Sequence, residues 1–195
     1  MVRRTRAEME KTRAALLAAA RDAFARHGYA EASMDAFTAQ AGLTRGALYH
    51  HFGDKPGLLA AVVAQIDAEM DARLHALSEA ADTPWTGLTS RCRAYLEMAL
   101  EPEIQQVVLR DARIVLGGAS AQSQHACIAS MQSLLEALMA QGVIATTDPQ
   151  ALAALIHGSL AEAAFWIATG DDGPTRLARS LDALDLLLRG LLRVD

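Results

Sequence analysis

The stretch that decides the fold is residues 43–55, Leu-Thr-Arg-Gly-Ala-Leu-Tyr-His-His-Phe-Gly-Asp-Lys. Thr44 stands where its hydroxyl can cap a short helix, and Gly53 ends that helix nine residues later. Upstream, Ser33 is placed to cap another short helix, and Gly42 interrupts the helical pattern between the two helices. Two short helices joined by a tight turn that contains glycine are typical of a helix-turn-helix. The sequence therefore predicts a DNA-binding motif.

The second of these helices has the pattern that a recognition helix needs, with one face in the protein core and one in the major groove. Leu48 and Phe52 are four residues apart and form the inward edge. Arg45 can donate two hydrogen bonds to a guanine edge. Gly46 has no side chain, which allows a close approach of the helix to DNA.

Other polar groups around this helix suit phosphate contacts, which fix the register of a protein on DNA. They are the Thr44 hydroxyl, Tyr49 and His50, while Lys55 begins the next helix, whose free amides also favour phosphate. The predicted DNA-binding set is Ser33, Thr44, Arg45, Gly46, Ala47, Tyr49, His50 and Lys55, and Arg3, Arg4 and Arg6 could form a basic arm.

Simpler structural roles compete with these assignments. Tyr49 could cover the hydrophobic core, and His50-His51 could be a solvated face. Adjacent helical residues point about 100° apart, so the two histidines do not easily share a metal ion. Packing is the preferred role for His51, and we predict no metal site.

The rest of the chain is also predicted to be helical, which makes the fold class all-α. Breaks at glycine and proline separate about nine helices, and strand-type alternation is absent. The expected helices span residues 6–27, 34–41, 45–52, 54–80, 85–100, 103–116, 119–141, 148–169 and 174–193. A three-helix DNA-binding domain at residues 1–54 is followed by a helical bundle at residues 55–195.

Charge is unevenly distributed along the 195 residues. The first 55 carry a net charge of +3 and the remainder −8, so the N-terminal head is the part suited to a polyanion. No apolar run exceeds seven residues, whereas a membrane-spanning helix needs about 20. We therefore expect a cytoplasmic protein without a membrane partner. Cys92 and Cys127 fit no metal spacing and are predicted to be small apolar core residues rather than a redox pair.

Residues 43–55 resemble the recognition-helix region of the TetR family of transcriptional regulators almost position for position. The stretch from Leu16 to Phe24 and the tripeptide 27–29, His-Gly-Tyr, are similar to that family's first helix, and the resemblance is specific over residues 10–59. It implies a homodimer that binds double-stranded operator DNA and responds to a small-molecule effector, usually as a repressor, without a cofactor. Phe37-Thr38 depart from the family's branched aliphatic and alanine, which predicts a small packing adjustment.

The resemblance also implies that the last two helices form a four-helix dimer interface. The last helix has leucines at alternating spacings of four and three, which suit packing against another helix. A purely intramolecular core helix is the alternative. The predicted interface residues are Leu152, Ile156, Leu160, Leu177, Leu181, Leu184 and Leu188.

In the resembled family, the helices between the head and the dimer interface surround a ligand cavity. Aromatic, methionine and polar side chains of this region could line it, although at helical spacing such residues are more often plain core. The predicted effector pocket consists of Trp85, Tyr95, Met98, Arg113, Met131, His157 and Trp166. The scarcity of charged residues in this region favours a mainly apolar effector.

Two other classes of function were compared with a ligand-responsive regulator. An α-helical enzyme is disfavoured, because the sequence has no His-Glu-x-x-His motif, no glycine-rich phosphate loop and no nucleophile signature, and we predict no catalytic residues. An architectural or adaptor DNA-binding dimer without a ligand remains the main alternative.

Overall fold

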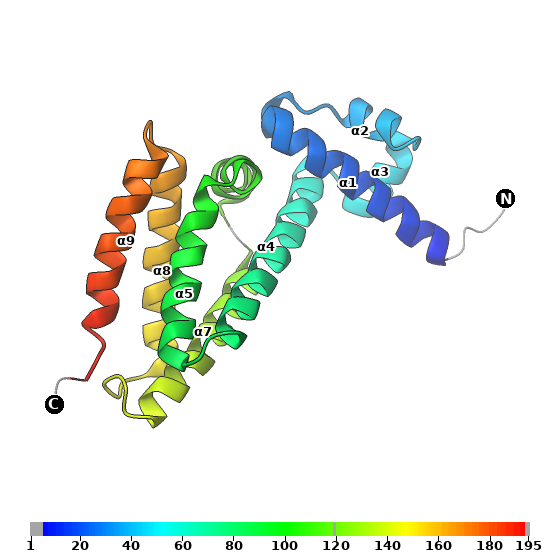
Figure 1. Ribbon diagram of the computed structural model, residues 1–195. Helices are drawn as coiled ribbons and strands as arrows, with labels where there is room; N and C mark the ends of the chain where they lie inside the picture. The colour runs from blue at the N-terminus through cyan, green and yellow to red at the C-terminus, as the bar shows by residue number, and fades with distance from the viewer. Residues whose placement is uncertain (1–5, 119, 194–195) are drawn as a thin grey trace. The chain divides into compact units, whose positions relative to one another are not determined.

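The computed structural model describes residues 6–118 and 120–193. These residues form a chain of helices (Figure 1), so the predicted all-helical class is confirmed. The elements are α1 (Arg6–Glu31), α2 (Met34–Gln40), α3 (Arg45–Phe52), α4 (Lys55–Glu79), α5 (Pro84–Glu97), the 3₁₀ turn η1 (Met98–Leu100), the π-helix η2 (Ile104–Asp111), α6 (Ala112–Leu116), α7 (Ala121–Ala140), α8 (Pro149–Ala168) and α9 (Gly173–Arg189).

The largest departure from the predicted helices lies in the middle of the chain. The single helix expected over residues 103–116 is a wide π-turned segment, η2, that tightens into the short helix α6. Gly117 then ends α6 in the left-handed conformation, at φ +80°. The spacing of apolar residues does not distinguish a π-helix from an α-helix, because the two differ in their hydrogen-bond register and not in the types of residue they contain.

Side-chain caps fix where several helices begin. Thr44 Oγ1 accepts a hydrogen bond from the Ala47 amide at 3.3 Å, and Asp54 Oδ1 accepts one from the Gly57 amide at 2.7 Å. These contacts satisfy first-turn amides that have no partner within the helix. Ser33 occupies the N-cap position of α2 in extended conformation but makes no capping hydrogen bond through its side chain.

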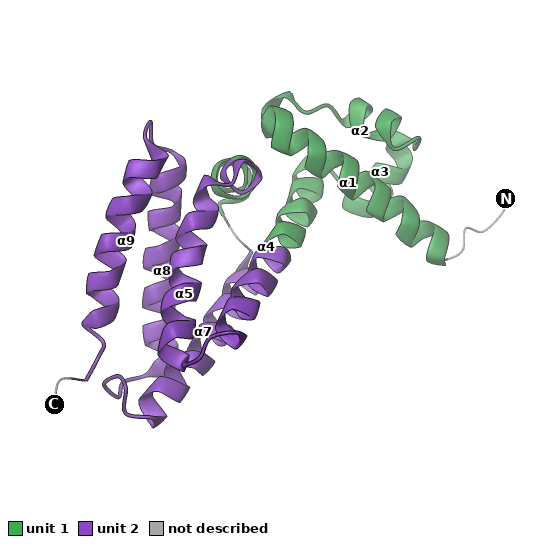
Figure 2. Cartoon of the chain, viewed as in Figure 1, with its two compact units in different colours: residues 1–66, 106–119 green, residues 67–105, 120–195 purple. Residues whose placement is uncertain are grey.

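The chain divides into two compact units, residues 1–66 with 106–119 and residues 67–105 with 120–195 (Figure 2). The first unit therefore contains a later segment of the chain that the boundary at residue 54 did not anticipate. Within it, α1 packs against α2 and α3. Phe24, Phe37 and Leu48 are fully buried there, and the two phenyl rings meet edge to face at 5.4 Å.

The second unit is a helical bundle in which α7 packs against α5 and α8, and α8 packs against α9. Its core contains Leu88, Leu135 and Ile167, all fully buried. Among the described residues, α8 is long and apolar enough to cross a membrane by length and composition alone. The helices α5, α7 and α9 pack against α8, which accounts for part of its apolar character.

Candidate DNA-binding site and effector cavity

The helix α3 has the two faces that its spacing predicted. Leu48 is fully buried, whereas Tyr49 is 51% exposed. Thr44, Arg45, Gly46 and His50 are exposed with Tyr49, as is Ser33 at the start of α2. The short helix therefore offers hydroxyl, guanidinium and imidazole groups on one surface, next to a glycine that leaves the backbone accessible.

The inward edge of α3 includes residues whose roles were less certain. Ala47 and His51 are half-buried. The His51 ring lies 5.3 Å from that of His50 and 6.1 Å from that of Phe52, measured between centroids. These contacts are what packing of His51 would produce.

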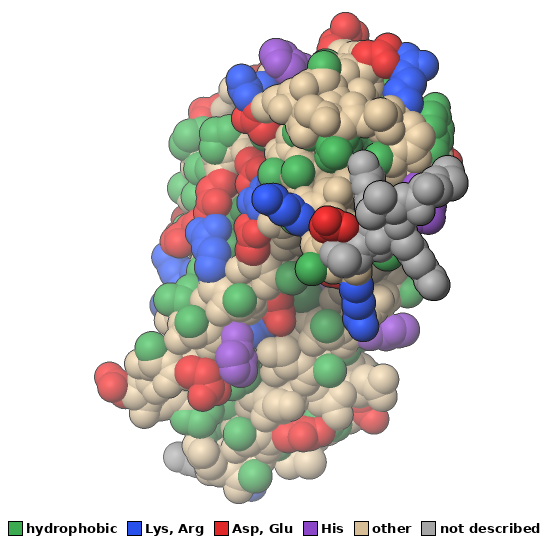
Figure 3. Space-filling model, turned by 90° about the vertical axis from the view of Figure 1, so that its right-hand side faces the viewer, with side chains coloured by type: hydrophobic (Ala, Val, Ile, Leu, Met, Phe, Trp, Pro, Cys, Tyr) green, Lys and Arg blue, Asp and Glu red, His purple; other side chains and the backbone are tan. Residues whose placement is uncertain are grey.

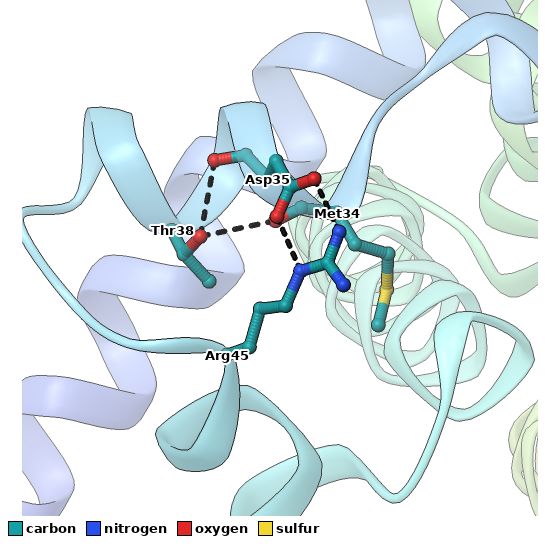
Figure 4. Close-up of polar contacts among 4 residues, drawn as sticks. All are labelled: Met34, Asp35, Thr38 and Arg45. Atoms are coloured by element: carbon teal, nitrogen blue, oxygen red, sulfur yellow. Dashed lines mark hydrogen bonds and ion pairs between the residues drawn. The ribbon is translucent and has the colours of Figure 1, made fainter.

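Arg45 forms an ion pair with Asp35 of α2 (Figure 4). Its Nε and Nη2 donate to the two carboxylate oxygens, and this contact with Arg45 lowers the pKa of Asp35. Both side chains are more than half exposed. A guanidinium has five N–H donors, so Nη1 keeps hydrogens for a base edge while Asp35 holds the other side. Sequence reasoning missed Asp35. It lies ten residues before Arg45 in the chain, and the turn between α2 and α3 brings the two side chains together.

The ammonium of Lys55 is tied to the end of α1. Its Nζ donates to the Ala30 carbonyl at 3.4 Å and lies 4.4 Å from the centre of the Tyr29 ring. The side chain is half-buried as a result. Burial, and then the nearby charge of Asp54, raise the pKa of Tyr29. A phosphate bound by Lys55 would therefore also lie close to the connection between α1 and α2.

The close packing between α2 and α3 accommodates the residues that depart from the family pattern. Phe37 is fully buried, and the Thr38 hydroxyl donates within its own helix to the carbonyls of Met34 and Asp35, at 3.3 and 3.0 Å (Figure 4). Sequence reasoning also missed Gly57, where the backbone of α4 lies so close to the end of α3 that no side chain fits. A Cβ atom there would lie 2.1 Å from the Phe52 carbonyl oxygen.

Residues 106–118 are held to the end of α1 by a small polar network. The Tyr29 amide donates to Asp111 Oδ2 at 2.8 Å, and Gln106 Nε2 donates to the other oxygen at 3.1 Å. Gly28 has φ +73°, and a Cβ atom there would lie 2.9 Å from Gln106 Nε2. The positive φ at this glycine thus produces a bend within α1 and leaves room for the Gln106 side chain.

The face drawn in Figure 3 carries basic and acidic side chains of the described residues interspersed with one another. Basic side chains are therefore not gathered into one block on that face. The predicted basic arm falls partly outside the described residues, because these begin at Arg6 and leave out Arg3 and Arg4.

A small internal cavity of about 10 Å³ lies in the second unit. Three of the predicted pocket residues, Tyr95, Met131 and His157, line it from α5, α7 and α8. The remaining lining residues were not predicted, and they are Leu74, Arg91, Cys92, Cys127 and Leu160. The two cysteines are free thiols, and although they are far apart in sequence they line the same cavity.

Arg91 is the charged group in the wall of this cavity. Its side chain is only 3% exposed, and Nη2 donates to Asp71 Oδ1 at 2.8 Å. Because Arg91 recurs with Leu88, Cys92 and Leu96 on the buried stripe of α5, an arginine at a core position was the signal that could have revealed it.

The other predicted pocket residues lie elsewhere. Trp166 is 42% exposed, with the Arg176 guanidinium 4.7 Å from its ring centre. Met98 is buried beside a separate open groove of about 560 Å³ along α4 and α5. Trp85 is half-buried without lining the cavity, and Arg113 is exposed in the first unit. These four side chains were assigned from residue type, which does not determine the direction in which a side chain points.

The leucine repeat of α9 faces its own subunit. Leu184 and Leu188 are 6% and 2% exposed in the single chain, and Ile156 and Leu160 of α8 are also buried. Leu152, Leu177 and Leu181 are half-buried. The exposed apolar side chains are instead their neighbours on the two helices, Leu155, Trp166, Leu186 and Leu187. Leu184 and Leu188 thus belong to the core of the single chain, whereas the half-buried members of the repeat keep some exposed surface.

Comparison with known proteins gives these surfaces a family context. Residues 16–62 match the family model described as bacterial regulatory proteins, tetR family, and residues 85–191 match the tetracyclin repressor-like C-terminal domain. The crystal structure of a TetR-family transcriptional regulator from Pectobacterium atrosepticum is 70% identical, with a TM-score of 0.93, over 98% of this chain and 99% of that one.

Curated relatives match mainly through the head. The HTH-type transcriptional regulator SrpR of Pseudomonas putida is 44% identical over 64 residues, which cover 33% of this chain and 30% of that protein. The HTH-type transcriptional repressor BepR of Brucella suis biovar 1 is 33% identical over 55% of this chain and 52% of that protein. The matched segments thus span only 30% and 52% of the length of these two relatives. With both halves matched by family models and a 70% identical structure, the chain belongs to the TetR family of transcriptional regulators.

Proposed function

We propose that this chain is a ligand-responsive repressor, which binds palindromic operator DNA as a homodimer and leaves it when a small, mainly apolar effector binds the second unit. The observation that carries the proposal is the exposed polar face of α3 over the buried Leu48. Regulators of this family bind operator DNA and function as dimers. The name of BepR identifies that relative as a repressor. We place the protein in the cytoplasm, where operator DNA is accessible.

Dimerisation supplies the specificity that one head lacks, because two copies related by a twofold axis contact two half-sites of a palindrome. The exposed Leu155, Leu186 and Leu187 are 72%, 74% and 63% accessible in the single chain. Apolar side chains gathered on two adjacent helices mark a contact surface. We assign the dimer interface to this stripe, with the half-buried Leu152, Leu177 and Leu181 at its edge.

Ligand control requires that the effector binds the DNA-incompetent conformation more tightly. The DNA-binding unit is joined to the second unit along α4, whose residues belong to both, and again within η2. The chain also passes between the units just before α7, so a ligand that repacks α5 and α7 has three covalent routes to the head. Two recognition helices must be about 34–36 Å apart to occupy successive major grooves, so a change of a few ångströms is enough to prevent binding.

Selection from randomised double-stranded DNA with the purified protein tests the DNA half of the proposal. We expect a palindrome with half-site centres about one helical turn apart, bound by one dimer or more. Selected sequences without twofold symmetry, or binding by a monomer, would contradict it.

The alternative function is a DNA-binding dimer without an effector, and the small volume of the cavity, about 10 Å³, favours it. Compounds that stabilise the protein in a thermal-shift screen separate the two functions. A repressor with an effector loses operator affinity as such a compound saturates the protein, by a coupling of roughly 1–3 kcal/mol. In the alternative, operator affinity stays constant.

A further inference from the structure

Arg91 has an unused donor in the core of the second unit. It is the one arginine, lysine or acidic side chain among the eight residues that line the cavity. Nη2 is occupied by Asp71, whereas Nη1 is buried without a hydrogen-bond partner among the described residues. A guanidinium stays charged at any physiological pH, and buried donors are nearly always paired. Nη1 is therefore suited to an acceptor that does not come from the chain.

The Asp71 carboxylate pairs with Arg91 at Nη2, and the other polar side chains that line the cavity carry no charge at neutral pH. Burial raises the pKa of Tyr95 and of Cys92 to about 12, so both stay protonated. Burial, and then the positive charge of Arg91, lower the pKa of His157, so its imidazole is neutral at pH 7. The cavity wall thus presents one positive charge among neutral groups and the apolar side chains of Leu74, Met131 and Leu160.

We propose that this cavity binds a small organic acid, whose carboxylate accepts hydrogen bonds from Arg91 Nη1 while its apolar body packs beside Met131 and Leu160. The inference rests on the proposed effector-controlled function. A volume of about 10 Å³ holds roughly one water molecule, so the acid must displace flexible side chains such as Met131. A charge-assisted hydrogen bond in a desolvated site is the interaction that offsets this rearrangement.

A cationic amine is the competing ligand class. Asp67 Oδ2 is also buried without a hydrogen-bond partner among the described residues. Asp67 is not among the cavity-lining residues, however, and burial raises the pKa of its carboxyl, which weakens its ability to hold a cation. The observations therefore favour the acid.

The test compares ligands that differ only in their head group. Straight-chain carboxylates of four to ten carbons and benzoate are each titrated calorimetrically beside their own primary amide and primary amine. At least one acid should bind about tenfold or more tightly than its amide, because a hydrogen bond to a charged acceptor is the stronger one. Absence of binding by every acid, equal binding of acids and amides, or preference for amines would each overturn the proposal.

Variants assign the preference to Arg91. In Arg91→Gln the advantage of the acid over its amide should disappear, whereas Asp71→Asn, which frees Nη2 as well, should enlarge it. Arg93→Gln is the matched control on the same helix, since Arg93 pairs with Asp185 at 3.0 Å and does not line the cavity. Circular dichroism confirms that each variant is folded. If Arg91→Gln does not fold, an unchanged acid preference in Asp71→Asn counts against the proposal.

Operator affinity, measured with the same ligands, separates this inference from the proposed function. Acids that bind through Arg91 but leave operator affinity unchanged would support the ligand class and refute effector control. Neutral apolar compounds that release the operator while acids do not bind would support effector control and refute the acid.

Discussion

The recognition helix and the cavity of the second unit differ in how directly their residues follow from the sequence. On α3, eight residues between a Thr44 cap and a glycine determine which side chains are buried and which are exposed. The cavity is assembled from α4, α5, α7 and α8, so its lining depends on packing between distant segments. Local contacts are encoded locally, whereas a cavity is a property of the packed bundle.

The largest expected effects come from substitutions of leucines on α9, where a buried and an exposed position should give different results. Leu184→Asp places a carboxylate in the core of the second unit and should unfold it, at a cost of several kcal/mol. Leu186→Asp changes a side chain that is 74% exposed and should leave the monomer folded while abolishing the dimer and operator binding. Sedimentation and circular dichroism distinguish the outcomes, and a stable Leu186→Asp dimer would refute the interface assigned to this stripe.

The next effect concerns base recognition by the head. Arg45→Ala should cost about 1–3 kcal/mol on the operator and relax base preference at one position per half-site. Asp35→Asn, which keeps Arg45 but removes its carboxylate partner, should relax preference at that same position. Competition binding with single-base operator variants measures both, and a loss of preference at different positions would separate Asp35 from Arg45.

A smaller and nonspecific effect is expected at Lys55. Lys55→Ala should weaken binding to all sequences alike and reduce the slope of affinity against salt concentration by about one unit. Because Nζ also contacts Ala30 and Tyr29, the thermal stability of the head serves as the control. An unchanged salt slope with altered sequence preference would show that Lys55 does not bind phosphate.

The features that could be predicted from the sequence follow the same contrast between the recognition helix and the cavity. The helix-turn-helix, the cap at Thr44 and the burial of Leu48 follow from spacing, and the structure contains them. Trp166 and Arg91 show where spacing fails. An aromatic was assigned to the cavity and is partly exposed, and an arginine that was assigned no role is buried and paired with Asp71. Neither outcome can be determined without knowing which helices are neighbours.

The smallest effect expected is the pH dependence that His157 gives to stability. Burial, and then the charge of Arg91, lower the pKa of this imidazole below its ordinary value of 6.5. Below about pH 6.5 the unfolded chain therefore binds more protons at this position than the folded protein, so the free energy of unfolding falls as the solution is acidified. Well above that pH, the imidazole is neutral in both states and its contribution to stability is constant.

His157→Gln removes this one titration and leaves the others in place. The melting temperature of the variant should fall less than that of the parent between pH 7.5 and 5.5, and the two curves should run parallel above pH 7. His125→Gln, at an exposed position of α7, is the matched control and should reproduce the parent curve. Parallel curves for His157→Gln and parent throughout the range would mean that the imidazole is solvated in the folded protein. The cavity wall would then be open to water at α8, and the contrast between an exposed recognition helix and a largely buried cavity would no longer hold.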